Sequence, residues 1–299
     1  MSKVHVVSFA TTIEDIGFPD LELRQIRLNK TAKAFGADET HSWTRQKLLK
    51  TQFYQENKRI LDLKKGAGFW LWKAFVIYDT LLKMNDGDYL FYCDNSLYFI
   101  DKFDDLLPIC DANNGIMLFV MDAIANGSVR RFTKKRLIQA VDADKTEYLD
   151  AQCVKANAYL FQKTEFSLAF AKEYLEWCQN PLYLLDEELL DLPILEEDKL
   201  YIGYHNHDQG IISILRVKYN LAGYRVLFQH GNHSKLPAYR VEGEWIMNDD
   251  YCNVFENSPY GQIMIWDKDG FGCKRPISHY FNIGKLEGFI KRKFTKNEK

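Results

Sequence analysis

The chain has 299 residues, with 39 basic and 41 acidic side chains and a net charge of −2. This balance, together with the lack of a basic patch with interleaved aromatics, excludes nucleic acid as the main partner. A chain of this length can bury a sizeable core. Its six cysteines form no Cys-x-x-Cys pair, so we expect reduced thiols rather than disulfides or a zinc site.

The first residues run directly into a strand-like segment, residues 4–10, with no signal peptide before it. No apolar stretch is long enough to span a bilayer. We therefore expect a cytoplasmic protein.

Strand-like and helix-like segments alternate along most of the chain, which predicts an α/β fold with a Rossmann-type, mostly parallel sheet and helices on both faces. Residues 43–63 are polar with helical runs, and Thr133 is a candidate N-cap for the helix that follows it. The predicted strands are 4–10, 89–92, 116–120, 151–162, 224–228 and 262–266, and the predicted helices are 21–35, 72–82, 103–110, 165–178 and 208–219.

The acidic segment 184–199 stands apart from this alternation. It could be a surface helix pair, a mobile flap over a cleft or a solvated acidic face, and the pattern favours the solvated face.

The chain shows no internal repeat and no low-complexity linker. We expect one catalytic domain over residues 1–235 and a C-terminal extension, 236–299, packed on the same domain. The extension ends in a basic segment with apolar insertions, residues 288–294, which either touches anionic lipid at the inner face of the membrane or is a frayed terminus.

The most informative segment is the apolar run Tyr89–Tyr92, which ends on Asp94 with Asn95 and Ser96 behind it. Ligands collect at the carboxyl ends of the strands in an open α/β sheet. A carboxylate at such a strand end can hold a divalent cation on a diphosphate, although it can also cap a turn.

Three blocks in order resemble a family of bacterial glycosyltransferases with the GT-A fold. They are Gly66-Ala67-Gly68-Phe69-Trp70-Leu71-Trp72-Lys73, the strand ending in Tyr92-Cys93-Asp94-Asn95-Ser96, and His205-Asn206-His207-Asp208-Gln209. The last block is also similar to the Asp-Gln motif of family-8-type retaining enzymes. The resemblance implies transfer of a sugar from a nucleotide-diphosphate donor, such as a UDP-sugar, to a saccharide or lipid-linked acceptor of surface-polysaccharide type, with Mn²⁺ or Mg²⁺ as cofactor and retention of configuration.

The resemblance makes Asp94 the leading metal ligand. Ser96 takes the place of the second acid of the usual Asp-x-Asp motif, and a hydroxyl is the weaker ligand. His230 or His233 could complete the metal site, with Lys235 on phosphate, or these side chains could belong to a polar loop without function.

His207, Asp208 and Gln209 are the predicted reaction centre, since a carboxylate and an amide at a helix start can grip sugar hydroxyls. Asp208 could instead serve as a helix N-cap. The predicted donor-binding residues are Ser8, Thr11, Trp72, Lys73, Gln152 and Asn157. For Trp72, core packing is the competing interpretation.

The sequence lacks the motifs of several other enzyme classes: it has no Gly-x-Ser-x-Gly, no His-Glu-x-x-His and no P-loop. The alternative to an active glycosyltransferase is a carbohydrate-binding or assembly protein that keeps the fold without catalysis. The missing second acid is the feature that favours this alternative.

Overall fold

The computed structural model describes residues 2–11, 21–121, 127–201, 204–230, 239–241, 244–246 and 259–266. Its centre is a six-stranded sheet with the order β2-β1-β3-β6-β5-β7. The strands are β1 (Val4–Ala10), β2 (Glu39–Thr44), β3 (Tyr89–Cys93), β5 (Ile116–Val120), β6 (Val154–Gln162) and β7 (Gly223–Arg225). The prediction of an α/β fold around a mostly parallel sheet is confirmed.

One strand runs against the others. β6 pairs antiparallel with both β3 and β5, whereas β1 pairs in parallel with β2 and β3, and β5 with β7. The strands β1, β3 and β5 are buried along their whole length, as their continuous apolar sequences predict.

The edge strand β2 was missed in the sequence. Its residues, Glu-Thr-His-Ser-Trp-Thr, are mostly polar and all half-buried, because an edge strand is covered on fewer sides. The helical runs expected over residues 43–63 begin only after it, as α3 (Arg45–Leu48) and α4 (Gln52–Leu61).

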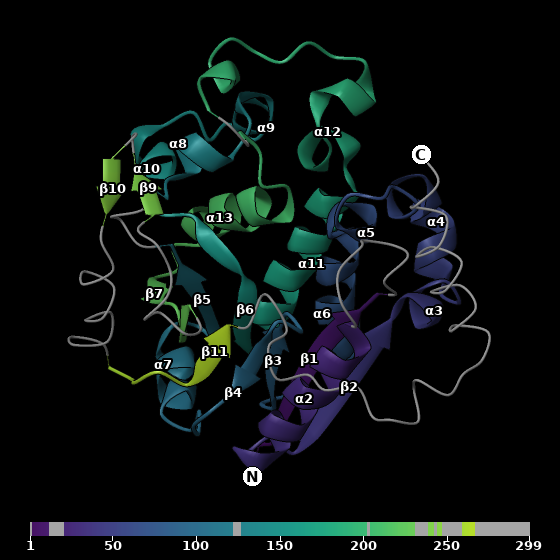
Figure 1. Ribbon diagram of the computed structural model, residues 1–299, viewed down its shortest axis with the longest axis vertical. Helices are drawn as coiled ribbons and strands as arrows, with labels where there is room; N and C mark the ends of the chain where they lie inside the picture. Colours follow the sequence, from purple (N-terminus) through teal and green to yellow (C-terminus); the bar gives the residue numbers. More distant parts are fainter. Residues whose placement is uncertain are drawn as a thin grey trace, which may run out of the picture.

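Helices cover both faces of the sheet (Figure 1). The helices α6 (Leu71–Lys83), α11 (Glu165–Gln179) and α13 (Asp208–Lys218) pack on one face, and α2 (Leu21–Ala34) and α7 (Leu106–Ala112) on the other. Each face has its own apolar core, because side chains alternate across a strand: Tyr92 belongs to the first core, and Phe91 and Cys93 to the second.

A small sheet closes the α2 face. It has the order β4-β11-β8 and contains β4 (Leu97–Phe99), β8 (Phe228–His230) and β11 (Met264–Trp266). β11 comes from the segment expected to be a C-terminal extension, and it pairs antiparallel with β4. A separate hairpin joins β9 (Tyr239–Val241) and β10 (Glu244–Ile246).

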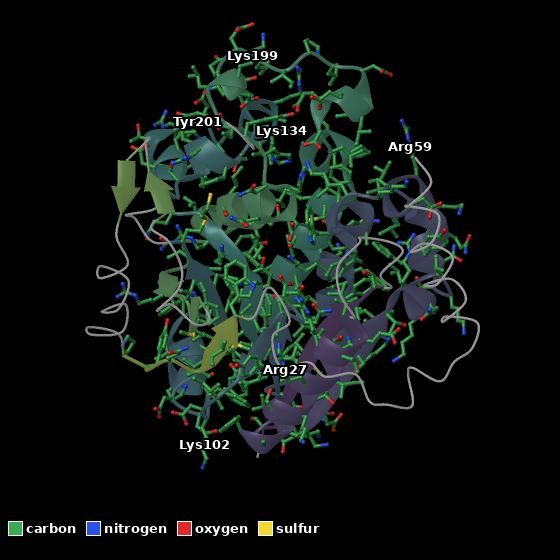
Figure 2. All side chains as sticks on the ribbon, in the orientation of Figure 1. Arg27, Arg59, Lys102, Lys134, Lys199 and Tyr201 are labelled. Carbon is green, nitrogen blue, oxygen red and sulfur yellow. The ribbon has the colours of Figure 1, made fainter. Side chains whose placement is uncertain are left out.

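The acidic segment is a solvated face in part. It forms short 3-10 helices, Glu187–Leu190 and Asp198–Leu200, after α12 (Pro181–Leu184). The Glu187 side chain is fully buried, 3.5 Å from the Lys134 ammonium and bonded to the Tyr204 hydroxyl at 2.7 Å. In Figure 2, Lys134 lies within the molecule, whereas Lys199 projects from its rim. Of the acids in this segment, only Glu187 and Asp198 are buried, and Glu187 pairs with Lys134. The side chains of Glu188, Asp191, Glu196 and Glu197 are exposed, as a solvated face predicts.

The predicted start of the helix after Thr133 is wrong by one residue. The N-cap of α9 (Lys135–Ala140) is Lys134, not Thr133, and Thr133 instead ends α8 (Val129–Phe132). A further short helix, α10 (Thr146–Leu149), follows.

Among the helices of the described ranges, none combines the length and the apolar character needed to cross a membrane. Four of the cysteines are buried and form no disulfide: Cys93, Cys110, Cys153 and Cys178.

Candidate active site at the carboxyl edge of the sheet

The Gly66–Lys73 block forms an unusual backbone turn. Five consecutive residues, 66–70, have positive φ, and three of them are Ala67, Phe69 and Trp70. Left-handed backbone costs a non-glycine residue roughly 1–2 kcal/mol, so the turn stores roughly 3–6 kcal/mol. Surrounding contacts must therefore hold it in place.

Glycine is required within this turn. At Gly68 a Cβ atom would lie 2.7 Å from the Leu61 Cα, so no side chain fits. The Trp72 indole donates a hydrogen bond to the Gly66 carbonyl at 2.9 Å, which closes the turn onto the start of α6. Trp72 also stacks on Phe9, with ring centroids 4.0 Å apart. It is a core residue, as the packing interpretation expected.

The turn delivers Lys73 to the interior. The Lys73 ammonium lies 2.8 Å from Asp208 Oδ2, and both side chains are at most 4% exposed. It also donates to the Ala156 carbonyl at 2.7 Å. An ion pair this deeply buried needs such additional hydrogen bonds to offset the desolvation of its charges.

Asp208 reaches this pair from the first residue of α13. Its Oδ2 also accepts a hydrogen bond from the Tyr174 hydroxyl at 3.3 Å. The N-cap position belongs to His207, which makes no side-chain cap bond. The N-cap interpretation of Asp208 is therefore wrong: its carboxylate binds Lys73 and Tyr174 instead of the helix backbone.

His207 lies between the left-handed turn and the start of α13, and its own backbone is strained. Its backbone has φ 47° and ψ −117°. Its ring stacks on Trp70 and meets Phe69 edge-on, with centroids 5.6 and 4.8 Å away, and its Nδ1 lies 2.9 Å from the Leu184 carbonyl oxygen. Burial lowers the pKa of His207 to about 4. The ring is thus a neutral, buried support that places the left-handed turn against the start of α13.

Asp94 directly follows β3, as predicted, and is half-buried. Its Oδ1 accepts a hydrogen bond from the Tyr92 hydroxyl at 2.5 Å, and its amide donates to the Asn157 carbonyl at 2.8 Å. Within the described part of the chain, Asp94 Oδ2 receives no hydrogen bond. Of the two acids in this cluster, Asp94 is the more exposed to solvent.

Lys73 is the positive group between the two acids. Burial alone would lower its pKa, but Asp208 and Asp94 outweigh burial and raise it. Burial raises the pKa of Asp208, and Lys73 opposes that shift. The direction for Lys73 decides the charge state, because a lysine whose pKa is above its usual range keeps its proton at neutral pH and holds Asp208 as a carboxylate.

Polar side chains of β6 border the cluster. Tyr159 stacks on Tyr92 across the strands, at 5.5 Å between ring centroids. Asn157 lies two residues earlier, on the same face of the sheet by strand alternation. It is 5% exposed, and both polar atoms of its side chain lack a partner among the described residues. Such an unpartnered amide is costly, and it is explained if a ligand binds there.

Gln209 and Gln152 meet at the end of β5. The Gln209 amide donates to the sulfur of Met121 at 3.3 Å, and the Gln152 amide donates to the Met121 carbonyl at 2.9 Å. Both are half-buried. The structure therefore brings five predicted residues into one region: Lys73, Asp94, Asn157, Asp208 and Gln209, with Gln152 beside them.

The remaining donor-site predictions fall at the end of β1. Ser8 is fully buried and its hydroxyl accepts from the Gln25 amide at 3.1 Å, which places it toward α2. The Thr11 hydroxyl is buried without a partner among the described residues. Asn95 ties this end to the motif, because its amide donates to the carbonyls of Phe9 and Leu21 at 3.1 and 3.2 Å.

The predicted metal ligands are only partly placed. The Ser96 hydroxyl accepts from the Trp266 indole at 3.1 Å. His230 lies opposite Trp266 in the β8–β11 pair, and Leu97 lies opposite Trp266 on the other side. His230 is therefore two strands from the motif, about 10 Å between backbones. His233 and Lys235 lie outside the described residues.

Three site residues were missed in the sequence: Tyr92, Tyr159 and Tyr174. The hydroxyls of Tyr159 and Tyr174 approach the acids only because β3, β6 and α11 come together, whereas Tyr92 contacts Asp94 two residues along the chain. The available signals are the Tyr92-x-Asp94 spacing and the alternating aromatics Tyr159 and Phe161, and alternating aromatics are equally typical of a core.

No protein-family model matches the sequence, and no curated protein is significantly similar to it. Among solved structures, the chain is similar to the apo crystal structure of mouse xyloside xylosyltransferase 1. The match has 10% identity and a TM-score of 0.44, and it covers 92% of this chain and 100% of that chain. At these values the likeness carries no functional argument, so the function is argued from the site.

Proposed function

We propose that the chain is a glycosyltransferase that moves a sugar from a nucleotide-diphosphate donor, a UDP-sugar, to a saccharide or lipid-linked saccharide. The observation that carries this proposal is the half-buried Asp94 at the carboxyl end of β3, backed by the buried Lys73–Asp208 pair and by the unpartnered Asn157 amide. The position is where ligands bind in open α/β sheets, and the acids, amides and hydroxyls are groups that hold a diphosphate-bound cation and a sugar.

Each residue has a proposed task. Asp94 holds a divalent cation through the oxygen that Tyr92 leaves free. Asn157, Gln152 and Gln209 bind sugar hydroxyls through their amides. Asp208 shares one oxygen between Lys73 and Tyr174, so its other oxygen can accept from the donor sugar, and Lys73 keeps it ionised.

Mn²⁺ or Mg²⁺ would neutralise the developing charge on the diphosphate leaving group. The donor set fits such an ion in part: Asp94 offers a carboxylate oxygen and Ser96 a hydroxyl. His230 or His233 is proposed as a further ligand, with Lys235 on the phosphate. Retention of configuration is proposed on the Asp208-Gln209 motif alone.

The test is turnover of a panel of UDP-sugars with Mn²⁺ or with EDTA, measured as release of UDP. We expect release that EDTA suppresses, and NMR of the first-formed product should show the donor's anomeric configuration. If no donor is turned over in the panel, the enzyme proposal is wrong, and an inverted product would overturn only the retaining mechanism.

The alternative is a carbohydrate-binding protein without catalysis. It is favoured by one observation. The side chains of Asn95 and Ser96 already form hydrogen bonds with Phe9, Leu21 and Trp266, so Asp94 is the one acidic ligand that the motif offers to a cation. A nucleotide-sugar that raises the melting temperature but is never turned over would support this alternative.

A further inference from the structure

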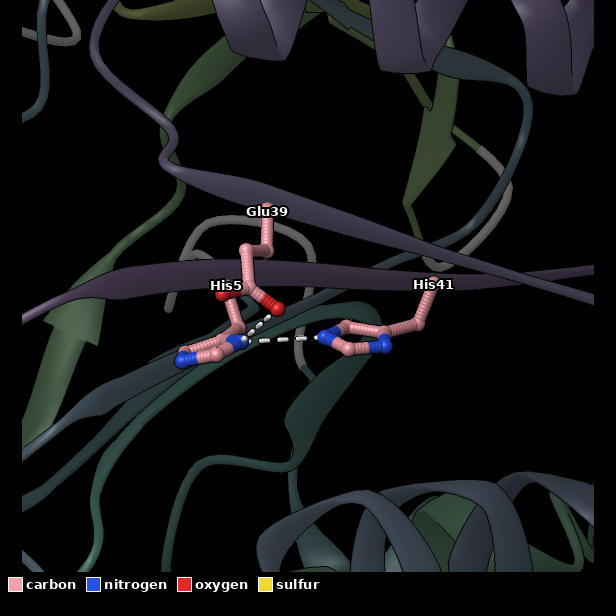
Figure 3. Close-up of side chains that lie close together, drawn as sticks. All are labelled: His5, Glu39 and His41. Carbon is pink, nitrogen blue, oxygen red and sulfur yellow. Dashed lines mark hydrogen bonds and ion pairs between the residues drawn. The ribbon is translucent and has the colours of Figure 1, made fainter. Parts of the chain in front are cut away.

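A second group of metal-binding side chains lies near the opposite, amino-terminal ends of the strands. His5 comes from β1, and Glu39 and His41 come from the edge strand β2. In the parallel register His5 pairs with Glu39 and Val7 with His41, so all three side chains lie near one another. One ligand atom of each residue lies within 4.8 Å of the others (Figure 3).

The facing atoms are already near the spacing that a tetrahedral ion requires. His5 Nδ1 lies 3.0 Å from His41 Nε2 and 3.7 Å from Glu39 Oε2. Zinc–nitrogen bonds of 2.0–2.1 Å place two tetrahedral ligand atoms roughly 3.3 Å apart. Small side-chain shifts would therefore admit an ion between them.

Neighbouring residues orient these ligands. His5 Nε2 lies 3.4 Å from the buried Asp88 carboxylate, which favours a proton on Nε2 and leaves the Nδ1 lone pair toward His41 and Glu39. The other oxygen of Glu39 is bound by the Lys3 ammonium at 2.7 Å, so Oε2 remains for the group. A carboxylate behind a histidine ligand is the usual outer shell of a zinc site.

The group also has access to solvent. It lines a cavity of about 360 Å³ whose walls include Lys47, Asp79 and Lys83. Three protein ligands and an open side leave a fourth position for water or an exogenous ligand.

We propose that His5, Glu39 and His41 form a binding site for a zinc-class divalent cation that joins the edge strand β2 to β1. Two imidazoles and one carboxylate suit Zn²⁺ better than Mg²⁺ or Ca²⁺, which prefer oxygen ligands. This site is distinct from the proposed Mn²⁺ or Mg²⁺ site at Asp94, because it lies on β1 and β2 toward the opposite edge of the same sheet. It does not depend on the glycosyltransferase proposal.

The test is Zn²⁺ titration of the metal-free full chain against a chromophoric chelator, with Co²⁺ absorption as a second probe. We expect one Zn²⁺ per chain, a tetrahedral Co²⁺ spectrum, and a melting temperature that rises with Zn²⁺. Glu39→Gln and His41→Gln should each weaken binding at least tenfold, and because both residues are half-buried on an edge strand the variants should fold.

Two controls fix the location. Asp79→Asn alters the same cavity wall without removing a proposed ligand and should bind Zn²⁺ as the parent does. The double variant His230→Gln/His233→Gln removes two of the other histidines and should also keep the site. Binding that survives Glu39→Gln and His41→Gln, or that vanishes in the His230/His233 variant, would overturn the proposal, and so would a parent chain that takes up no Zn²⁺, since His5 and His41 would then be only a hydrogen-bonded pair.

Discussion

Lys73 carries the only positive charge of the buried cluster among the described residues, and the cluster depends on it. Removing it leaves Asp208 as an unpaired buried carboxylate, and breaking a buried pair in this way costs about 3–5 kcal/mol. We expect Lys73→Met to lower the free energy of unfolding by that amount in urea denaturation. Adding Asp208→Asn to it should restore part of the loss, because the second change removes the uncompensated charge.

The control for this cycle is Lys145→Met, which removes an exposed partner of Asp142. Ion pairs on the surface contribute little to stability, so we expect no measurable change in the free energy of unfolding of this variant. If Lys73→Met were as harmless as Lys145→Met, the Lys73–Asp208 contact would not be a buried ion pair.

Asp94 is the residue whose charge should matter for turnover and not for stability. Asp94→Asn keeps an oxygen for the Tyr92 hydroxyl but removes the charge that holds a cation. We expect UDP release to fall by about a hundredfold or more, with an unchanged melting temperature. Asp142→Asn, at an exposed turn, is the matched control, and equal activity of the two variants would remove Asp94 from the metal site.

His207 should make the fold sensitive to acid. Its folded pKa is about 4, against about 6.5 in the unfolded chain. Above pH 6.5 the ring is neutral in both states, so it has no effect there. As the pH falls from 6.5 to 4 the unfolded state takes up the proton first, and up to about 3 kcal/mol of stability is lost.

This prediction is checked by urea denaturation at several pH values from 7 to 4.5. His207→Gln can still donate to the Leu184 carbonyl, and it should flatten the loss. Burial also lowers the pKa of His205, so part of the acid-induced loss of stability should remain in the variant. Burial raises the pKa of Asp208, so protonation of Asp208 offsets part of that loss. An unchanged slope in the variant would show that His207 is not the group that titrates.

Residue by residue, the sequence predicted those members of the site that follow a local pattern. Asp94 ends an apolar run, and Asp208-Gln209 begins an amphipathic helix, so the sequence could single out both as candidates. The contacts of Tyr174 with Asp208, and the lack of partners for Asn157, arise from elements far apart in the chain and leave no local trace. For Asp208 the pattern also allowed a capping role, because the sequence of a helix start is the same whether the carboxylate bonds to the backbone or to Lys73.

At the level of elements, the left-handed turn over residues 66–70 is the feature that the sequence could not reveal. Its two glycines suggest a turn, but Ala67, Phe69 and Trp70 favour ordinary helical or extended backbone. The turn exists because Trp72, His207 and Leu61 pack around it. β2 was missed for a related reason, since its strand conformation comes from pairing with β1 and not from an apolar pattern.

The turn should therefore not accept a side chain at Gly68. Gly68→Ala adds a Cβ atom 2.7 Å from the Leu61 backbone, at φ 101°. We expect a loss of several kcal/mol in thermal or urea unfolding, from overpacking and backbone strain together. Gly261→Ala, where nothing lies within 4 Å, is the matched control and should stay near the parent. Similar stabilities for the two variants would mean that the turn can rearrange.

On the scale of the whole molecule, the layered α/β architecture followed from the alternation of elements, because each strand and helix must bury one face against another layer. The antiparallel direction of β6 did not follow. The described residues before it, 127–153, form short helices, and β6 starts at the end of the sheet where β5 finishes. Sequence periodicity does not reveal at which end of the sheet such a connection finishes.

The segment after residue 235 should prove to be part of the same cooperative unit. Tyr260, Ile263 and Met264 are buried in the core that α2 and α7 cover. We expect Met264→Ala to lower the free energy of unfolding by about 2–5 kcal/mol. Leu82→Ala, at a residue 52% exposed, should cost much less. A separate, earlier unfolding step in Met264→Ala would instead show an independent extension.

The pairing of β4 with β11 also bears on how the protein is made. Phe99 of β4 pairs with Met264 of β11, so β4 is synthesised long before the strand that it pairs with. At 5–20 residues per second, synthesis of the intervening chain takes roughly ten to thirty seconds. During that interval β4 presents an unpaired apolar edge, Leu97 and Phe99, to other nascent chains. Chaperone dependence during translation, and aggregation of products that stop before residue 264, are the expected cellular consequences of placing the closing strand so late.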